Sequence, residues 1–489
     1  MGKVLNAVTG GLIGLALITT PILAADAPKA PLRAATATRP TALDAYVAKK
    51  DSVYGWKLAK TIKGPGYTDY ILDLTSQSWR SAGEVDHPVW KHWLHVVVPD
   101  HVVSDRGFLY IDGGSINDPV PTTASARAVK VAVDTGTVAA EVHMVPNQPL
   151  KFPDDPTKGR GEDDLIAYSR VKFIDTKDPE WLVRLAMVKS GTRALDAVQE
   201  FMKSGQAGGT KTNVNKFVVS GGSKRGWTAW LVAAVDKRVM GVIPIVIDAL
   251  NSEEVTKHGF EAYGEFSSSL GDYVNHGLFP HKIGTPEYQA VLAIEDPINY
   301  RDRPRMKMPK YEINASGDQF FTPDNSQFYY WALPEEKRIR YVPNARHNLG
   351  ETDAQDSMVS FYQAVITGHK RPRYTFSKDA DGTLHVHPID TPKEVNLWQA
   401  TNPNARDFRK DVIGNAYSMS RARPDGKGDY VVRLPNPEKG YTAFFIELVY
   451  DSGFKYPFKF TSEVSVVPVA MPHQWSESFT RYAATKNNK

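Results

Sequence analysis

The fold class is decided by the stretch Val218-Val219-Ser220-Gly221-Gly222-Ser223-Lys224-Arg225-Gly226-Trp227. It reads as the end of a buried strand, a turn of small residues and the start of a helix. A serine at the apex of such a turn is held above the sheet, where a base can reach its hydroxyl, as in a nucleophile elbow. The common elbow is Gly-x-Ser-x-Gly, whereas here Arg225 takes the place of the second glycine and Gly226 follows it. The alternative is a Gly/Ser-rich turn that binds an anion or nothing.

Short apolar strands alternate with helical stretches on both sides of this turn. A long helical stretch is expected from about Asp178 to Lys203. Strand signals before the elbow occur at 70–74, 93–98, 107–111 and 139–145, the elbow strand is 216–220, and strand signals after it occur at 239–247, 310–315 and 339–342. Alternation of this kind is typical of a mostly parallel sheet that helices cover on both faces.

Two further residues follow predicted strands in an order that fits the elbow. Asp318 lies just after one strand and His347 just past the next. The order Ser…Asp…His is that of α/β hydrolases, and open α/β sheets place their sites at the carboxyl ends of the strands. We therefore predict Ser223 as nucleophile, His347 as base and Asp318 as the acid. Taken singly, Asp318 could cap a turn and His347 could be an ordinary histidine. Asp248 also ends a strand and is the alternative acid.

The oxyanion hole of such a site needs two backbone amides. We predict those of Lys224, directly after the nucleophile, and of Gly114, in the Gly-Gly loop after strand 107–111; the alternative is an ordinary Gly-Gly turn. Two cations directly after a nucleophile are unusual. Lys224 or Arg225 would hold an acidic group of the substrate or stabilise the tetrahedral anion, and we predict a substrate-binding role for Arg225. A salt bridge that fixes the elbow is the equally weighted alternative.

The composition excludes several classes of protein. The 489 residues are 42% hydrophobic and include no cysteine, so disulfides, thiolate metal sites, a cysteine nucleophile and a lipid-modified cysteine are absent. The 59 basic and 55 acidic residues give a net charge of +4, which argues against nucleic acid as a partner. His92 and His95 fall on opposite faces of a predicted strand, so we expect no metal site, and no cofactor.

The N-terminus predicts export. Lys3, an apolar run from Leu12 to Leu23 and the small residues before Asp26 are typical of a secretory signal peptide over residues 1–25. The run is shorter than the roughly 20 apolar residues of a membrane span, although an uncleaved anchor is the alternative. A flexible leader is expected over residues 26–42. We expect a periplasmic or secreted protein with no stable membrane insertion after cleavage.

The rest of the chain falls into segments that differ in composition and in strand pattern. The stretch from Asn251 to Arg305 is rich in aromatics, Gly, His and Ser, has no strand signal, and is expected to be an inserted lid over the sheet edge. After Arg371 the pattern becomes β-rich, which predicts an antiparallel β-sandwich. The predicted units are a hydrolase domain over 43–371 with the lid at about 251–305, a β domain over 372–472 and a tail over 473–489.

Several motifs resemble those of one known family, in order along almost the whole mature chain. They are Ser76-Gln-Ser-Trp-Arg80, Pro88-Val-Trp-Lys-His-Trp-Leu94, Val145-Pro-Asn-Gln-Pro-Leu150, Arg160-Gly-Glu-Asp-Asp-Leu-Ile-Ala-Tyr168, the elbow, the segments at 315–324 and 342–349, and Leu397-Trp-Gln-Ala-Thr-Asn-Pro-Asn-Ala-Arg-Asp-Phe-Arg409. Together they resemble the PhoPQ-activated pathogenicity-related protein family. The resemblance implies an exported α/β hydrolase with a C-terminal β domain, and a link to virulence or to antimicrobial-peptide resistance. The elbow alone is also similar to that of glucuronoyl esterases, whose acidic uronate esters would suit Lys224 or Arg225.

The expected activity is acyl transfer by a serine hydrolase, with ester hydrolysis as the outcome. Peptide or amide cleavage is the first alternative. The others are a catalytically silent secreted binding protein on a hydrolase scaffold, and an envelope- or carbohydrate-binding protein that works through its β domain. The expected partner is a small-molecule, ester or peptide substrate. The oligomeric state is left open.

Overall fold

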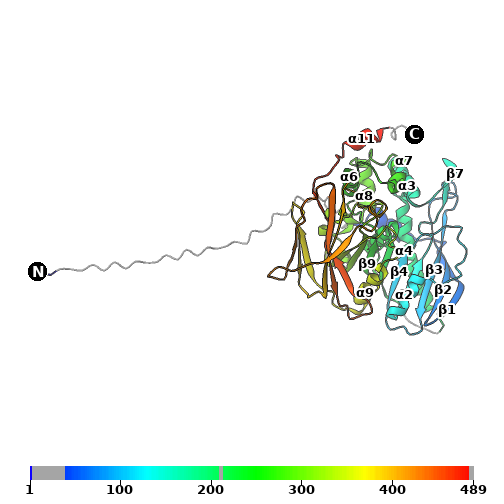
Figure 1. The fold of residues 1–489 in the computed structure, drawn as a ribbon. Helices are drawn as coiled ribbons and strands as arrows, with labels where there is room; N and C mark the ends of the chain where they lie inside the picture. The colour runs from blue at the N-terminus through cyan, green and yellow to red at the C-terminus, as the bar shows by residue number, and fades with distance from the viewer. Residues whose placement is uncertain (3–38, 209–212, 484–489) are drawn as a thin grey trace.

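The computed structural model describes residues 1–2, 39–208 and 213–483 (Figure 1). Apart from Met1 and Gly2, the predicted signal peptide lies outside the described residues, and so does the predicted leader up to residue 38. None of the helices in the described part combines the length and the apolar content that a membrane span requires. The first helix, α1 (Ala42–Ala48), begins at Thr41, whose side chain and that of Asp44 form a capping box.

A nine-stranded sheet forms the centre of the molecule. Its strands run in the order β1 (Gly55–Gly64), β2 (Tyr67–Ser78), β3 (Val89–Pro99), β5 (Val138–Val142), β4 (Arg106–Ile111), β8 (Lys216–Gly222), β9 (Val239–Ile245), β10 (Lys310–Ala315) and β11 (Lys337–Val342). All pairs from β5 to β11 are parallel, whereas β1, β2, β3 and β5 pair antiparallel. The predicted mostly parallel sheet of an α/β-hydrolase fold is thus confirmed, with an antiparallel edge. The parallel strands are buried along most of their length because helices cover both faces.

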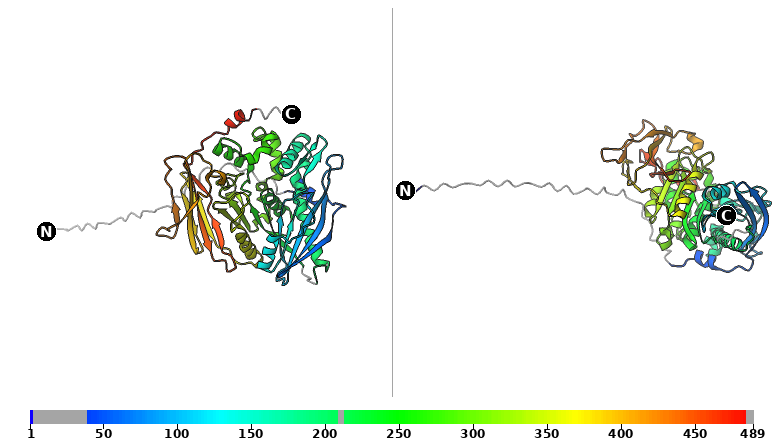
Figure 2. Two further views of the ribbon diagram at one scale, coloured as in Figure 1. Left: turned by 45° about the vertical axis from the view of Figure 1, so that its right-hand side comes forward. Right: turned by 90° about the horizontal axis from the view of Figure 1, so that it is seen from below.

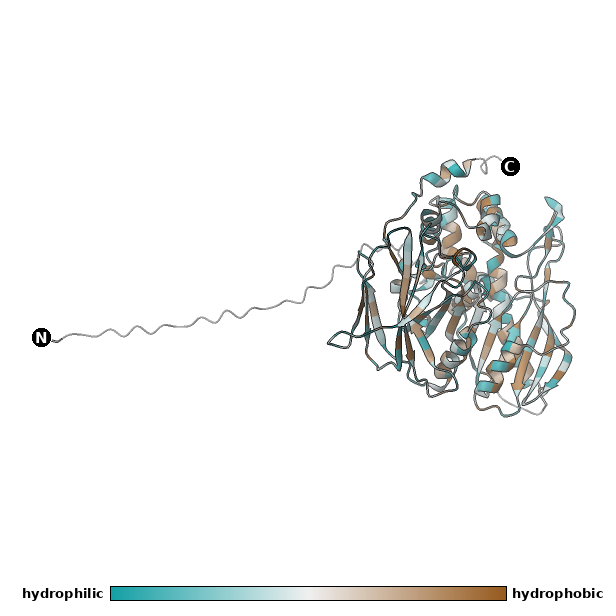
Figure 3. Cartoon of the chain, in the orientation of Figure 1, coloured by the Kyte–Doolittle hydropathy of each residue, from teal (hydrophilic) through white to brown (hydrophobic). Residues whose placement is uncertain are grey.

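The helices lie in two layers, one on each face of the sheet (Figures 1 and 2). α2 (Ala126–Thr135) and α9 (Ala354–Thr367) pack together on one face, and α4 (Val183–Lys203) and α5 (Lys224–Val235) pack together on the other. Colouring by hydropathy shows brown, apolar residues concentrated on the central strands (Figure 3).

The helical stretch expected from Asp178 begins differently. Residues 178–182 hold only a short 3-10 turn, η1 (Pro179–Trp181), which begins at Asp178, whose side chain accepts from the amide of Glu180. The turn ends at Leu182, whose extended backbone (φ −64°, ψ 102°) separates it from the next helix. α4 starts after that turn. A separate helix, α3 (Glu162–Thr176), precedes it and was not predicted from the sequence.

The segment between β9 and β10 is helical and lies at one end of the molecule, at the top of Figure 1. It contains α6 (Ser252–Tyr263), α7 (Gly271–Asn275), α8 (Pro286–Glu295) and short 3-10 turns, and no strand among its residues, all of which are described. α7 and α8 pack on α3. This segment is the predicted lid insertion, at the carboxyl edge of the sheet.

After α9 the chain forms two antiparallel sheets, seen in yellow to red in Figure 1. One contains β12 (Tyr374–Lys378), β13 (Leu384–Pro388) and β16 (Tyr430–Val432). The other contains β15 (Ser418–Arg421), β14 (Glu394–Asn402), β17 (Tyr441–Tyr450) and β18 (Phe458–Thr461), and β19 (Ser465–Val467) also pairs with β17. Leu384 of the first sheet packs with Phe444 and Val467 of the second, as in a sandwich.

The end of the described chain lies on the lid. α11 (Glu477–Arg481) is the red helix at the top of Figure 1. Just before it, the ring centroid of Trp475 lies 5.8 Å from that of Phe260 and 6.0 Å from that of Phe266. Arg481 donates a hydrogen bond of 2.9 Å to the carbonyl oxygen of Gly264. We call residues 473–482 the C-terminal strap, since this part of the predicted tail packs on the lid.

Candidate active site

Ser223 occupies a strained turn between β8 and α5. Its backbone has φ 55° and ψ −127°, a conformation that non-glycine residues rarely adopt and that costs about 1–3 kcal/mol. The amide of Ser223 donates to the carbonyl oxygen of Ile245 at 2.8 Å, and its own carbonyl accepts from the amide of Trp227 at 3.0 Å. The turn is thus held by the neighbouring strand on one side and by the first turn of α5 on the other.

Two glycines allow this turn to close. A Cβ on Gly221 would lie 2.5 Å from the carbonyl oxygen of Arg225, and one on Gly226 would lie 2.8 Å from the carbonyl oxygen of Gly221. The end of β8 and the start of α5 therefore touch backbone to backbone. This contact explains why position 226 is a glycine.

His347 and Asp318 form a hydrogen-bonded pair in which the carboxylate is buried and the imidazole is partly exposed. Nδ1 of His347 donates to the two carboxylate oxygens of Asp318, at 2.9 and 2.8 Å. The backbone of His347 donates to the side chain of Gln319 at 3.0 Å, and Asp318 also accepts from the amide of Phe320 at 2.7 Å. Nε2 of His347 is buried without a hydrogen-bond partner among the described residues, Ser223 included. The carboxylate therefore sets the orientation of the ring and leaves Nε2 free.

Asp248 has different neighbours. Its carboxylate accepts hydrogen bonds from the hydroxyls of Tyr329 at 2.6 Å and Tyr341 at 2.7 Å. Burial raises the pKa of Asp248 well above its ordinary value, and the nearby Glu312 adds to the shift, although the two tyrosine bonds oppose it. Of the two predicted acids, Asp318 is the one that contacts a histidine in this structure.

The two cations after Ser223 are paired within the protein. Arg225 donates to both carboxylate oxygens of Glu162, at 2.8 and 2.5 Å, and to the carbonyl oxygen of Val145 at 2.6 Å. Nζ of Lys224 lies 2.8 Å from Glu162 and 3.1 Å from Asp163. Burial alone would raise the pKa of Glu162, but the hydrogen bonds and charges of Arg225 and Lys224 outweigh it and hold the pKa at about 2. A substrate-binding role of Arg225 stays a prediction, and the geometry is that of the salt-bridge alternative.

Glu162 and Asp163 are site residues that the sequence analysis missed. They stand with Asp164 in the first turn of α3, where acidic side chains are favoured by the helix dipole. Three consecutive acids after Gly161 were the available signal for a helix start at this point. Without the helix, nothing in the sequence connected these acids to an elbow about 60 residues later.

The two predicted oxyanion amides lie at the ends of neighbouring strands. Gly114 follows β4, which pairs with β8, and Lys224 is the first residue of α5. The first amides of a helix have no carbonyl partner within it. Gly114 has φ +133°, a backbone conformation that residues with a Cβ rarely adopt. A Cβ at this position would lie 2.8 Å from Oδ2 of Asp118. Arg225 packs against the adjoining Gly113, so the same guanidinium holds this loop and the elbow.

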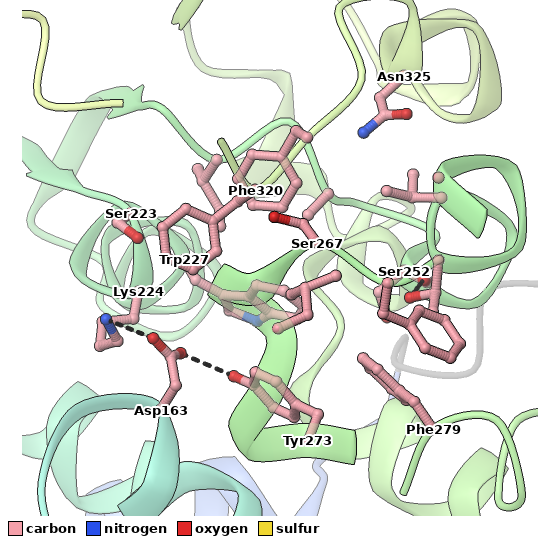
Figure 4. A pocket seen from close by; sticks show the side chains of 18 of the residues that line it. Asp163, Ser223, Lys224, Trp227, Ser252, Ser267, Tyr273, Phe279, Phe320 and Asn325 are labelled. Carbon is pink, nitrogen blue, oxygen red and sulfur yellow. Dashed lines mark hydrogen bonds and ion pairs between the residues drawn. The ribbon is translucent and has the colours of Figure 1, made fainter. Parts of the chain in front are cut away.

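A cavity of about 830 Å³, its open mouth included, begins at Ser223. Figure 4 shows Ser223 and Lys224 on one side of it and Ser252 and Phe279 on the other. Phe320, whose ring centroid lies 4.4 Å from that of His347, also lines it. Other aromatic residues of the lining are Trp227, Phe260, Tyr263, Phe266, Tyr273, Tyr288 and Phe321. Most of them come from the lid.

One cluster away from Ser223 has residue types that bind metals. Side-chain atoms of Asp112, Glu141 and His143 lie within 4.8 Å of one another. Arg127 donates to Asp112 at 3.0 Å and to Glu141 at 2.6 Å, so its guanidinium supplies the positive charge in this cluster. Burial raises the pKa of Glu141 to about 7, against the opposing charge of Arg127. This arrangement is an ion-pair network that joins β4, β5 and α2.

Comparisons with known proteins agree with the resemblance noted in the sequence. The model of the PhoPQ-activated pathogenicity-related protein family matches residues 43–409. Autocrine proliferation repressor protein A of Dictyostelium discoideum is 38% identical over 461 residues, which cover 88% of this chain and 91% of that protein.

Solved structures with a similar architecture include two esterases. An acetyl xylan esterase from Paenibacillus sp. R4 matches with a TM-score of 0.46 and 16% identity, over 66% of this chain and 92% of that chain. A glucuronoyl esterase from Solibacter usitatus matches with a TM-score of 0.37 and 16% identity, over 65% of this chain and 87% of that chain. The fold assignment rests on the strand order and elbow of this chain.

Proposed function

The chain belongs to the PhoPQ-activated pathogenicity-related protein family, and we propose that it is a serine hydrolase of carboxylic esters. The observation that carries the proposal is the pairing of His347 with Asp318 at the sheet edge where Ser223 occupies its strained turn. An unpartnered, buried Nε2 on His347 gives the base that a serine nucleophile requires.

The proposed reaction has two halves. Ser223 Oγ attacks the carbonyl carbon while His347 Nε2 takes the hydroxyl proton. The C–O bond to the alcohol then breaks, and the proton passes from His347 to the leaving oxygen. In the second half His347 takes a proton from water, whose oxygen attacks the acyl carbon, and returns it to Ser223 as the carboxylic acid leaves. Asp318 keeps the proton of His347 on Nδ1 and stabilises the imidazolium.

The negative oxygen of each tetrahedral intermediate is proposed to bind the amides of Gly114 and Lys224. Both stand at the carboxyl edge, just beyond the ends of the neighbouring strands β4 and β8. One lost oxyanion donor costs roughly 100–1,000-fold in kcat in serine hydrolases. In this proposal Arg225 positions the Gly113-Gly114 loop against the elbow through its bonds to Val145 and Glu162.

Labelling with a fluorophosphonate probe tests the nucleophile. Wild type is expected to be labelled and Ser223→Ala is not, while Ser204→Ala, at the distant end of α4, labels like wild type. Hydrolysis of p-nitrophenyl acetate should fall in Ser223→Ala by a factor of up to about 10⁶. Equal labelling of all three proteins would show that the reactive nucleophile is another residue, and labelling of none would leave a silent binding protein on a hydrolase scaffold. Faster turnover of the matching p-nitroanilide would make the protein an amidase.

We also propose that the protein is exported and cleaved after about residue 25. Support comes from the basic and apolar pattern of residues 3–25 and from the word "autocrine" in the name of the Dictyostelium relative. Mass spectrometry of the protein from cell fractions should find a new N-terminus near residue 26 in the periplasm or medium. Full-length protein in the membrane fraction would show an uncleaved anchor instead. A role in virulence or peptide resistance, which the family name suggests, predicts that a deletion strain is more sensitive to cationic peptides.

A further inference from the structure

The cavity beside Ser223 has a lining that indicates the chemical class of the substrate. We propose that it binds an uncharged, hydrophobic acyl group larger than acetyl, such as a medium-chain aliphatic one. This inference rests on the proposed ester hydrolysis, and it goes further because it assigns a specificity to the lid. The cavity is an open hollow of about 830 Å³ counted with its mouth, and its lining, not its volume, carries the inference.

Aromatic and aliphatic side chains form most of the wall. The lid contributes Phe260, Phe266 and Phe279, and the segment after Asp318 contributes Phe320 and Phe321. An acetyl group would leave most of this surface without contacts, whereas a longer chain would cover it. Each buried methylene contributes roughly a 10-fold preference or more in such pockets. The lining therefore favours a larger apolar group.

The charged residues of the wall are already engaged with one another. Lys224 is paired with Glu162 and Asp163, and Asp163 also accepts from the hydroxyl of Tyr273 at 2.9 Å (Figure 4). Arg170 donates to Glu295 at 2.8 Å. An acidic acyl group entering the cavity would have to displace one of these bonds, and carboxylates cost much to bury without a free cation.

Arg184 is the remaining cation of the wall. Its side chain is 2% exposed, it donates to the carbonyl oxygen of Lys224 at 3.2 Å, and its guanidinium lies 4.6 Å from the ring centre of Trp227. Glu295 is 3.7 Å away. Because so little of Arg184 is exposed, we expect it to support the floor of the cavity and not to bind a carboxylate. A succinyl ester, whose acyl group carries a carboxylate, therefore tests whether any cation of the wall binds an acidic group.

The acyl side of the ester fits the cavity better than the alcohol side. In acyl transfer the acyl group stays on Ser223 while the alcohol takes its proton from His347 and departs. Ser223 lines the cavity, whereas His347 does not, and the side chain of His347 is 16% exposed. The alcohol would thus leave on the side of His347, and the acyl group would remain in the cavity.

Gly259 offers a way to fill the cavity. It lies within α6, lines the cavity, and a Cβ added to it meets no atom within 4 Å. A side chain at this position would project into empty space without disturbing the helix backbone. Gly271, which starts α7 with the same free space around a Cβ but does not line the cavity, is the matched control.

The experiment compares kcat/KM for p-nitrophenyl acetate, hexanoate and monosuccinate. Wild type should prefer hexanoate to acetate by at least about 10-fold, the contribution of a single buried methylene out of the four that hexanoate adds, and should turn over the succinate most slowly. Gly259→Leu should lower that hexanoate-to-acetate ratio by about 10-fold, while Gly271→Leu leaves the ratio as in wild type. Thr256→Leu, on the same face of α6, is a second filling variant if Gly259→Leu does not fold.

The outcomes separate the inference from the proposed function. Equal or faster turnover of acetate by wild type, fastest turnover of the succinate, or an unchanged ratio in both filling variants would overturn the acyl specificity while ester hydrolysis stands. Absence of hydrolysis of all three esters, together with no labelling of Ser223 by a fluorophosphonate, would overturn both.

Discussion

Two buried carboxyl groups, those of Asp318 and Asp248, differ in what they contact. Asp318 holds Nδ1 of His347, and Asp248 accepts from two tyrosines. Asp318→Asn is therefore expected to lower kcat for ester hydrolysis by about 10⁴-fold, because the amide no longer favours the reactive tautomer of His347. Asp248→Asn should lower kcat less than tenfold. A larger loss in Asp248→Asn than in Asp318→Asn would show that Asp248 is the acid.

The ionisation of Glu162, which pairs with the cations of the elbow, makes the stability of the folded protein depend on pH. Its pKa of about 2 in the folded protein lies below the ordinary value of 4.5, so the folded state binds the proton less readily than the unfolded state. The stabilisation by Glu162 is therefore complete above about pH 4.5 and is lost as the pH falls towards 2. Urea midpoints of wild type and Glu162→Gln should differ at pH 7 and converge between pH 4.5 and 2. A difference that does not change with pH would contradict this assignment.

At the scale of elements, the close contact of β8 with α5 depends on glycine. A Cβ on Gly226 would lie 2.8 Å from the oxygen of Gly221 and 3.1 Å from that of Ile245, both backbone atoms that cannot turn away. Gly226→Ala is expected to cost about 1–3 kcal/mol in the free energy of unfolding and to displace Ser223. Gly259→Ala, in open space within α6, should instead stabilise the protein by about 0.5–1 kcal/mol. Urea denaturation measures the free energy of unfolding of both variants. Equal changes in Gly226→Ala and Gly259→Ala would contradict the close backbone contact between β8 and α5.

The central strands could be predicted from the sequence because most of them contain a short, mainly apolar run that is followed by a turn. The elbow, Asp318 and His347 all follow such runs, and the order of the strands brings their ends to one edge. β15 could not be found in this way, since all four of its residues are exposed and it has no apolar pattern. α3 was missed because its burial comes from the lid and from α4, not from one apolar stripe.

The pairing of the elbow cations could not be predicted for a related reason. Arg225 and Glu162 are 63 residues apart, and their contact depends on where α3 docks. From the sequence alone, a cation next to a nucleophile could equally bind the substrate or form a structural ion pair. Only the position of a distant helix separates the two readings.

At the scale of the whole molecule, the C-terminal sheets are joined to the central sheet through β18. Phe460 is fully buried, with its ring centroid 5.3 Å from that of Tyr311 in β10 and 5.9 Å from that of Tyr374 in β12. Thr461 accepts a bond of 3.1 Å from the amide of Tyr341 in β11. Phe460→Ala should therefore lower the free energy of unfolding by about 3–5 kcal/mol, within one transition for the whole protein.

Val431→Ala, at an exposed position of β16, is the control and should change that free energy by less than about 0.5 kcal/mol. Calorimetry with tryptophan fluorescence as a second probe would detect separate transitions. If Phe460→Ala lowered only a transition of the C-terminal sheets and left the rest unchanged, the two parts would be independent.

The C-terminal strap has a consequence for the order in which the parts of the protein can fold. Trp475 and Arg481 pack on the outer side of the lid but are made long after it, since Arg481 follows its partner Gly264 by 217 residues. Chains fold from the N-terminal end as they emerge. The lid therefore lacks this outer support until residues 473–482 have been made, and a chain truncated after residue 472 would carry every residue of the proposed triad beneath a lid without the strap.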